Sequence, residues 1–180
     1  MPFGQILIST QVFYTTPLSF ALVNLKPLLP GHVLVSPRRR VPRLTDLKAE
    51  EVSDLFSAVQ KVQRALAQIY FVAAAESQRA APADGGFTIA IQDGPDAGQT
   101  VPHVHCHVIP RPGGGGQGDD IYDRLASEEG NVGGALWDRD HRPQAGRILP
   151  RIEDSARTPR SGEDMAAEAQ HLRHQMEGLE

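Results

Sequence analysis

The stretch PHVHCHVIPR, residues 102–111, alternates between histidine and apolar residues. Since successive side chains of a β-strand point to opposite faces, we expect a strand over residues 103–109. One face would carry His103, His105 and His107. The other would carry Val104, Cys106 and Val108, which are apolar because a free cysteine packs like a small hydrophobic residue. The alternation therefore predicts a sheet that packs its apolar face against a helix and leaves the histidines on an open face.

The rest of the chain predicts an α+β fold built around this strand. Aliphatic and β-branched runs predict further strands at residues 4–9, 12–16, 19–25, 32–36 and 87–92. Apolar residues at helical spacing predict a long amphipathic helix over residues 49–71. Its expected buried face is Val52, Leu55, Phe56, Val59, Val62, Leu66, Ile69 and Tyr70. We expect an antiparallel sheet of about five strands in a half-barrel, since no alternating βαβ pattern is present.

A second helix is expected near the C-terminus, over residues 163–178. Ser161 and Asp164 match the S-x-x-D capping pattern at its start. Its expected buried face is Met165, Ala169, Leu172 and Met176. Residues 73–86 predict a surface loop, and residues 112–160 a largely irregular or disordered region, because both are rich in small, polar and turn-forming residues. We interpret residues 1–180 as a single domain.

Composition narrows the classes of function. The net charge of −4 offers no overall basic field for nucleic acid, and no apolar run is long enough to span a membrane. Cys106 is the sole cysteine, so an intrachain disulfide is excluded and a reducing compartment is expected. The first ten residues lack a signal-peptide pattern. We expect a cytoplasmic or nuclear location, with a small-molecule partner and no nucleic acid or membrane.

The three histidines allow three interpretations from the residues alone. They could be structural, although three histidines in strict alternation with apolar residues are not expected to arise by chance. They could bind a metal, as in an oxygenase or isomerase, but no acidic residue follows within Thr100–Gly118 to complete a ligand set. They could be catalytic, because neutral imidazole is a good nucleophile toward phosphorus near pH 7. Neighbouring imidazoles could then donate hydrogen bonds to phosphate oxygens.

The segment HVHCHVI at residues 103–109 resembles the motif of the histidine triad family of nucleotide hydrolases and transferases. Further blocks resemble one branch, the fragile histidine triad proteins, which are dinucleoside triphosphate hydrolases. These blocks lie at residues 3–5, 18–37, 46–56, 91–111, 121–125 and 163–173. Their order along the chain makes the resemblance specific. The loop at 73–86 is longer than is usual in the branch, and residues 126–160 have little to match.

The resemblance implies a role for each matching residue. His105 would be the nucleophile that attacks the α-phosphorus of diadenosine triphosphate, giving ADP and a nucleotidyl-histidine that water hydrolyses to AMP. The groups expected to orient His105 and stabilise charge are His103, His107 and His32. Polar contacts to the phosphate chain are expected from Gln92 and Thr100, and a ribose contact from Asn24. An apolar slot for the base is expected from Phe3, Ile8, Leu22 and Leu34. Tyr122 occupies the place of a regulatory tyrosine.

The same resemblance implies a homodimer that binds a dinucleoside polyphosphate. We expect no metal site in the protein and no tightly bound cofactor; any Mg²⁺ or Mn²⁺ would accompany the polyphosphate. Two alternatives remain open. One is a nucleotide-binding signalling protein with slow hydrolysis. The other is a histidine triad nucleotidyl transferase or phosphoramidase.

Overall fold

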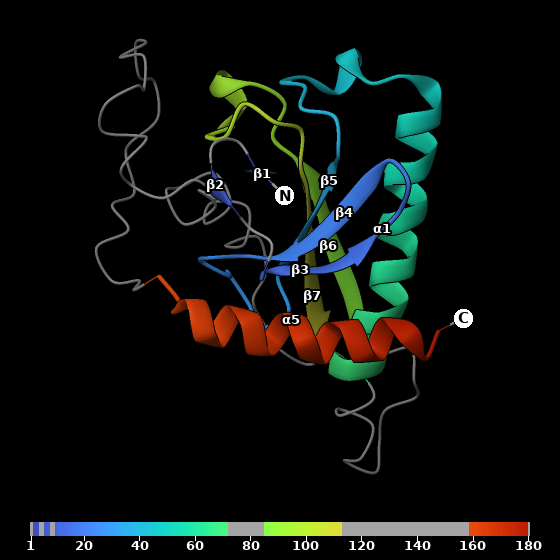
Figure 1. The fold of residues 1–180 in the computed structure, drawn as a ribbon, viewed down its shortest axis with the longest axis vertical. Coiled ribbons are helices and arrows are strands. Elements are labelled where there is room, and N and C mark those ends of the chain that lie inside the picture. Colours follow the sequence, from blue (N-terminus) through green and yellow to red (C-terminus); the bar gives the residue numbers. More distant parts are fainter. Residues whose placement is uncertain (1, 4–5, 8–9, 72–84, 113–158, 180) are drawn as a thin grey trace.

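The computed structural model describes residues 2–3, 6–7, 10–71, 85–112 and 159–179 (Figure 1). Its strands are β1 (Pro2–Phe3), β2 (Ile6–Leu7), β3 (Val12–Thr15), β4 (Ser19–Val23), β5 (Val33–Pro37), β6 (Gly85–Ile91) and β7 (Cys106–Pro112). Its α-helices are α1 (Ala49–Tyr70) and α5 (Gly162–Glu177), and short 3₁₀ turns lie at Leu44–Asp46 and Pro95–Ala97. None of the described helices is long and apolar enough to cross a membrane. The predicted α+β class, with a long helix and a C-terminal helix, is confirmed.

The main sheet has five antiparallel strands in the order β3-β4-β5-β7-β6. β1 and β2 form a separate two-stranded pair. Within the strand predicted over residues 4–9, the described residues Ile6–Leu7 form β2, and the other four lie outside the described part of the chain. The other predicted strands are present with shifted ends. The predicted loop and irregular region overlap strands at their edges, since Gly85 and Gly86 belong to β6 and Pro112 belongs to β7. Residues 73–84 and 113–158 lie outside the described part of the chain.

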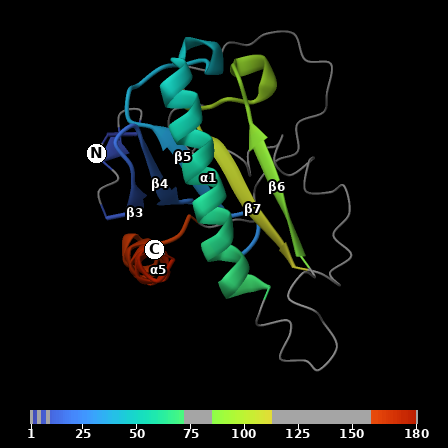
Figure 2. The same cartoon turned by 90° about the vertical axis from the view of Figure 1, so that its right-hand side faces the viewer.

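Both helices cover the same face of this sheet (Figure 2). The core joins alternate residues of β4, β5 and β7 to the inner faces of α1 and α5. Its strand members include Ala21, Val23, Val33, Val35, Cys106 and Val108. The predicted inner face of α5 is correct in all four residues, and Ser161 Oγ accepts the predicted capping bond from Asp164 N–H at 3.0 Å. Sequence periodicity therefore located this layer correctly.

The inner face of α1 is rotated slightly from the prediction. Leu55, Val59, Val62 and Leu66 are buried as expected. The prediction that Phe56 is buried is wrong, because its side chain is 41% exposed. The small residues Ala58 and Ala65 lie in the core instead. A buried face predicted from large apolar residues alone is displaced in this way, because it omits the alanines that pack where the helix lies close to the sheet.

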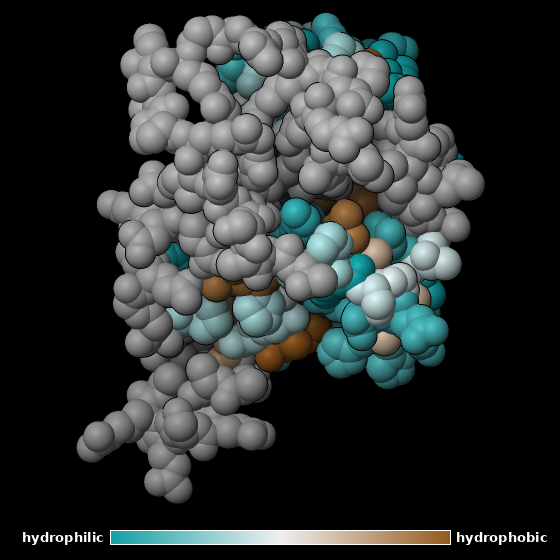
Figure 3. Space-filling model, turned by 90° about the vertical axis from the view of Figure 1, so that its left-hand side faces the viewer, coloured by the Kyte–Doolittle hydropathy of each residue, from teal (hydrophilic) through white to brown (hydrophobic). Residues whose placement is uncertain are grey.

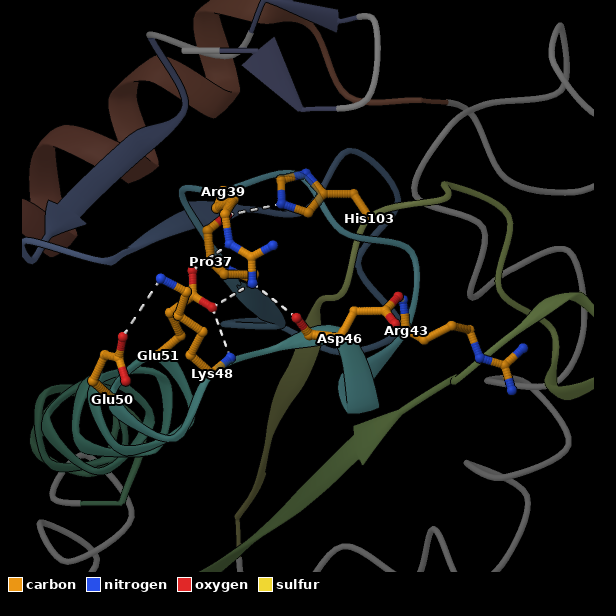
Figure 4. Close-up of polar contacts among 8 residues, drawn as sticks. All are labelled: Pro37, Arg39, Arg43, Asp46, Lys48, Glu50, Glu51 and His103. Atoms are coloured by element: carbon orange, nitrogen blue, oxygen red, sulfur yellow. Dashed lines mark hydrogen bonds and ion pairs between the residues drawn. The ribbon is translucent and has the colours of Figure 1, made fainter.

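The N-terminus of α1 is fixed to the end of β5 by an arginine (Figure 4). Arg39 donates two hydrogen bonds to the carboxylate of Glu51, at 2.7 and 2.6 Å, and a third to the Asp46 carbonyl at 2.8 Å. Glu51 also accepts from Lys48 N–H at 2.8 Å, which satisfies an otherwise unpaired amide at the helix start. The hydrogen bonds from the Arg39 side chain and then from the Lys48 backbone N–H lower the pKa of Glu51 to about 2.

The opposite face of the sheet carries a smaller apolar cluster of Val12, Phe20, Leu22, Leu34 and Val101. Leu22 pairs with Leu34 across β4 and β5, and Leu34 pairs with His107 across β5 and β7. This second face therefore places apolar residues in register with the histidine strand. On the face shown in Figure 3, the apolar surface in view is limited to small areas among hydrophilic side chains.

Candidate active site

The strand β7 begins at Cys106, so His103 and His105 precede it rather than lie within it as predicted. The reason is that Val104 bonds outside the ladder. Its N–H donates to the Val41 carbonyl at 2.8 Å, and its carbonyl accepts from Ser36 Oγ at 2.6 Å. The expected separation of faces nevertheless holds, because Val104, Cys106 and Val108 all lie in the helix-covered core.

The sequence predicts that the histidines lie on an open face of the sheet, but these side chains are buried in the structure. The exposed fractions of His103, His105 and His107 are 1%, 1% and 0%, and His32 is also 0% exposed. Three of these rings are adjacent: the ring centroids of His105 and His107 are 5.1 Å apart, and those of His32 and His107 are 5.2 Å apart. The structure therefore brings His32, 75 residues away along the chain, into contact with the histidine segment.

Hydrogen bonds fix which nitrogen of His105 carries its proton. Nδ1 lies 2.7 Å from the His103 carbonyl oxygen, which can only accept, so Nδ1 donates. In the neutral ring the lone pair is then on Nε2. Burial, partly offset by the carbonyl bond, lowers the pKa of His105 to about 4. At neutral pH the ring is a neutral imidazole whose Nε2 can act as a nucleophile.

A second set of bonds orients His107 through His32. Leu28 N–H donates to His32 Nδ1 at 3.1 Å, so the proton of neutral His32 lies on Nε2. That Nε2 donates to His107 Nδ1 at 2.9 Å, which leaves the His107 proton on Nε2. Within the described part of the chain, His107 Nε2 is buried with no hydrogen-bond partner. It is therefore a donor available to an acceptor beside His105.

Burial keeps all of these rings uncharged. It lowers the pKa of His32 to about 3, with the positive charge of Arg160 as the next cause. It lowers the pKa of His107 well below the ordinary value, and the pKa of His103 in the same direction. His103 Nε2 donates to the Pro37 carbonyl at 2.8 Å (Figure 4), which connects this ring to the end of β5 beside Arg39.

A glycine allows His32 to approach its partners. Gly31 has φ +77°, and a Cβ atom at that position would lie 2.3 Å from Cε2 of Tyr70 at the end of α1. Any other residue would both strain the backbone and collide with the tyrosine ring. The turn before β5 thus requires glycine at position 31 because of its contact with α1.

The remaining predicted residues occupy different positions around the histidines. Asn24 is 1% exposed, and its Nδ2 lies 3.2 and 3.3 Å from the two ring nitrogens of His32. Leu22 and Leu34 lie on the histidine side of the sheet, in the smaller apolar cluster. Gln92 and Thr100 are buried on either side of the turn at 94–99, where Gly98 approaches the Gln92 amide closely.

Several predictions fall where the structure gives no side-chain description. Phe3 lies in β1, and neither its packing nor its contacts are described. Ile8 and Tyr122 lie outside the described residues.

Two residues that position the site were missed from the sequence. Ser36 fixes the Val104 carbonyl through its hydroxyl. Arg160 contacts Asn24 from 136 residues away. Ser36 sits at an ordinary strand position, and Arg160 sits at the end of a stretch interpreted as irregular, so no local pattern identified either one. Among the described residues, no group of three or more His, Cys, Asp or Glu side chains is arranged to hold a metal ion.

The HIT domain family model matches residues 6–114, and the chain belongs to the histidine triad (HIT) family. Within that family it belongs to the fragile histidine triad branch, whose name is carried by relatives from Arabidopsis thaliana and Caenorhabditis elegans. The chain is 44% identical over 180 residues to the asymmetrical bis(5'-nucleosyl)-tetraphosphatase of Schizosaccharomyces pombe, covering 95% of this chain and 91% of that protein.

Two further comparisons support this assignment. The chain is 53% identical over 120 residues to the bifunctional bis(5'-adenosyl)-triphosphatase/adenylylsulfatase of Arabidopsis thaliana, covering 66% of this chain and 60% of that protein. The crystal structure of Plasmodium falciparum diadenosine triphosphate hydrolase, in complex with cyclomarin A, matches with a TM-score of 0.58 and 27% identity. That match covers 98% of this chain and 84% of the other.

Buried neutral histidines predict that the protein loses stability as the pH falls below 6.5. Histidines of the unfolded chain bind protons near that pH, whereas His32, His105 and His107 stay neutral in the fold. The free energy of unfolding should therefore fall by about 1.4 kcal/mol per pH unit for each such ring between pH 6.5 and 5. Urea titrations at pH 5.0 to 8.0 would measure it.

Two variants separate this effect from other titrations. His107→Asn should reduce the slope by the contribution of one ring. His171→Gln, which removes an exposed histidine of α5, is the matched control. Equal slopes for the wild type and His107→Asn would contradict the assignment of buried neutral rings.

Proposed function

We propose that this protein hydrolyses dinucleoside polyphosphates, with diadenosine triphosphate as the preferred substrate, through a nucleotidyl-His105 intermediate. The observation that carries the proposal is the Nδ1–H bond from His105 to the His103 carbonyl. It places the lone pair on Nε2, and burial keeps that nitrogen unprotonated at neutral pH. Relatives named as bis(5'-adenosyl)-triphosphatases support the triphosphate as substrate. The relative named as an asymmetrical bis(5'-nucleosyl)-tetraphosphatase supports the wider class of dinucleoside polyphosphates.

The reaction takes two displacements at one phosphorus atom. His105 Nε2 forms a bond to the α-phosphorus, and the electron pair of the bridging P–O bond leaves with ADP. Water then attacks the same phosphorus, the N–P bond breaks, and AMP is released. His107 Nε2–H, oriented by His32, donates to a phosphate oxygen where negative charge accumulates. Mg²⁺ or Mn²⁺ accompanies the polyphosphate as part of the substrate.

The nucleoside is proposed to bind on the face of the sheet that the helices leave uncovered. Leu22 and Leu34 are in register with His107 and offer an apolar surface for the base, to which Phe3 and Ile8 would add. Asn24, beside His32, is proposed to contact the ribose, and Gln92 and Thr100 the phosphate chain. A largely apolar pocket with a few placed polar groups is the usual form of such sites.

Product analysis in ¹⁸O-labelled water tests the chemistry. With diadenosine triphosphate, we expect the label in AMP and unlabelled ADP, because water attacks the α-phosphorus. His105→Asn should lower kcat by about 10⁴-fold or more while Kd for the substrate changes little. Label in ADP would place the attack on the β-phosphorus and overturn the mechanism, as would full turnover by the variant.

The lowered pKa of His105 predicts an activity profile that extends to acid. Protonation of Nε2 removes the attacking lone pair, and the pKa of His105 is about 4. We therefore expect initial-rate kcat/KM to stay level from pH 7.5 to about 5 at a temperature where the protein is folded. An acid limb centred near pH 6.5 would show an ordinary, solvated histidine and contradict the assignment.

A homodimer is also part of the proposal. Among the described strands, β6 lies at one end of the main sheet and carries Ile89 with 38% exposure. An exposed edge strand with an apolar side chain is suited to pairing with a second copy. Sedimentation velocity should report a dimer at micromolar concentration, and Ile89→Lys should weaken it. A wild-type monomer across that range would refute this part.

A further inference from the structure

Arg160, two residues before α5, ties that helix to the turn that follows β4. Its Nη2 donates to the Asn24 carbonyl, and its own N–H donates to the Leu25 carbonyl at 3.2 Å. Its Nη1 donates to Glu168 Oε2 at 2.5 Å. The guanidinium is thus held by Glu168 of α5 on one side and binds the Asn24 carbonyl on the other, while the backbone N–H of Arg160 binds the next carbonyl, that of Leu25. Planar guanidinium groups suit this task because their donors have fixed directions.

The segment that Arg160 fixes leads directly to the candidate active site. The side chain of Asn24 lies against His32, and its Oδ1 accepts from Lys26 N–H at 3.2 Å. Leu28 N–H bonds His32 Nδ1, and His32 bonds His107. A continuous path of hydrogen bonds therefore runs from Glu168 through Arg160, Asn24 and His32 to His107.

The ion pair of Arg160 and Glu168 is partly shielded from solvent. Their side chains are 23% and 19% exposed, so water competes less for these bonds than at an open surface. The positive charge of Arg160 also contributes to the lowered pKa of His32, which agrees with its proximity to that ring.

We propose that Arg160 is a positioning residue for nucleoside binding, which holds the backbone of Asn24 so that the Asn24 side chain is preorganised. Glu168 in turn orients Arg160. This inference rests on the proposed function, because it assigns Asn24 to the ribose. Arg160 acts through Asn24 and does not itself contact the nucleotide. The nucleophile His105 is held separately by the His103 carbonyl, and His32 is oriented by Leu28 N–H, so the effect falls on binding rather than on the chemical step.

Arg160→Met tests the proposal by kinetics. We expect KM for diadenosine triphosphate and Kd for AMP to rise about tenfold, since bonds to charged groups are involved, while kcat changes less than about threefold. Arg160→Lys keeps one charged donor and should restore KM to within about threefold of the wild type. Hydrogen–deuterium exchange without nucleotide should show faster exchange at the amide of Lys26, which donates to Asn24 Oδ1, in the methionine variant.

Arg173→Met is the matched control. Arg173 lies within α5 and, like Arg160, donates to a backbone carbonyl, but its acceptor is the Val12 carbonyl of β3, at 2.7 Å. The Arg173→Met substitution should lower the melting temperature without raising KM or the exchange rate of the amides at residues 24–32. The proposal is overturned if Arg160→Met keeps the wild-type KM and exchange, or if Arg173→Met reproduces both changes.

The two readouts also separate this inference from the proposed function. A wild-type protein that neither hydrolyses diadenosine triphosphate nor binds AMP overturns the proposed function and, with it, the assigned role of Asn24. The exchange experiment needs no nucleotide. Protection at residues 24–32 that depends on Arg160 supports the positioning contact whatever the ligand, and protection that is independent of Arg160 refutes it.

Discussion

Each imidazole of the cluster uses one ring nitrogen for a hydrogen bond that leaves the other nitrogen with a defined role. The His103 carbonyl accepts a hydrogen bond from Nδ1–H of His105, and Leu28 N–H donates to Nδ1 of His32, which sets the opposite tautomer there. Because burial suppresses protonation of every ring, these assignments persist at neutral pH. An acceptor nitrogen and a donor nitrogen are thereby prepared side by side before any ligand arrives, which lowers the cost of reorganisation during reaction.

Alternate residues of the same strands build the hydrophobic core on one face of the sheet and the candidate active site on the other. On β5, Val33 and Val35 fill the core, while Leu34 lies beside His107 on the other face. Stability and chemistry are therefore coupled through the backbone of a few strands. Cys106 illustrates the core side: it is buried, and burial raises the pKa of its thiol to about 12, so it packs as an inert residue between two histidines.

Much of this arrangement could be predicted because it is periodic. The alternation in 103–109 identified the core side of the histidine segment, and the inner face of α5 was correct residue by residue. The limits of the strand could not be predicted, because Val104 bonds to Ser36 and Val41 through contacts that only the fold creates. Burial of the histidines and the role of Arg160 also depend on segments far apart in sequence.

The contact between Tyr70 and Gly31 has a consequence for the helix that carries the tyrosine. Tyr70 is the last residue of α1, and its ring occupies the space where a Cβ of Gly31 would be. Adding or deleting a single residue within α1 would swing the tyrosine by about 100° around the helix axis. The length of α1 therefore sets the spacing between its contact with Arg39 at one end and its contact with the His32 turn at the other. Substitutions on the outer surface of α1 leave this spacing unchanged, whereas an insertion or a deletion within the helix alters it.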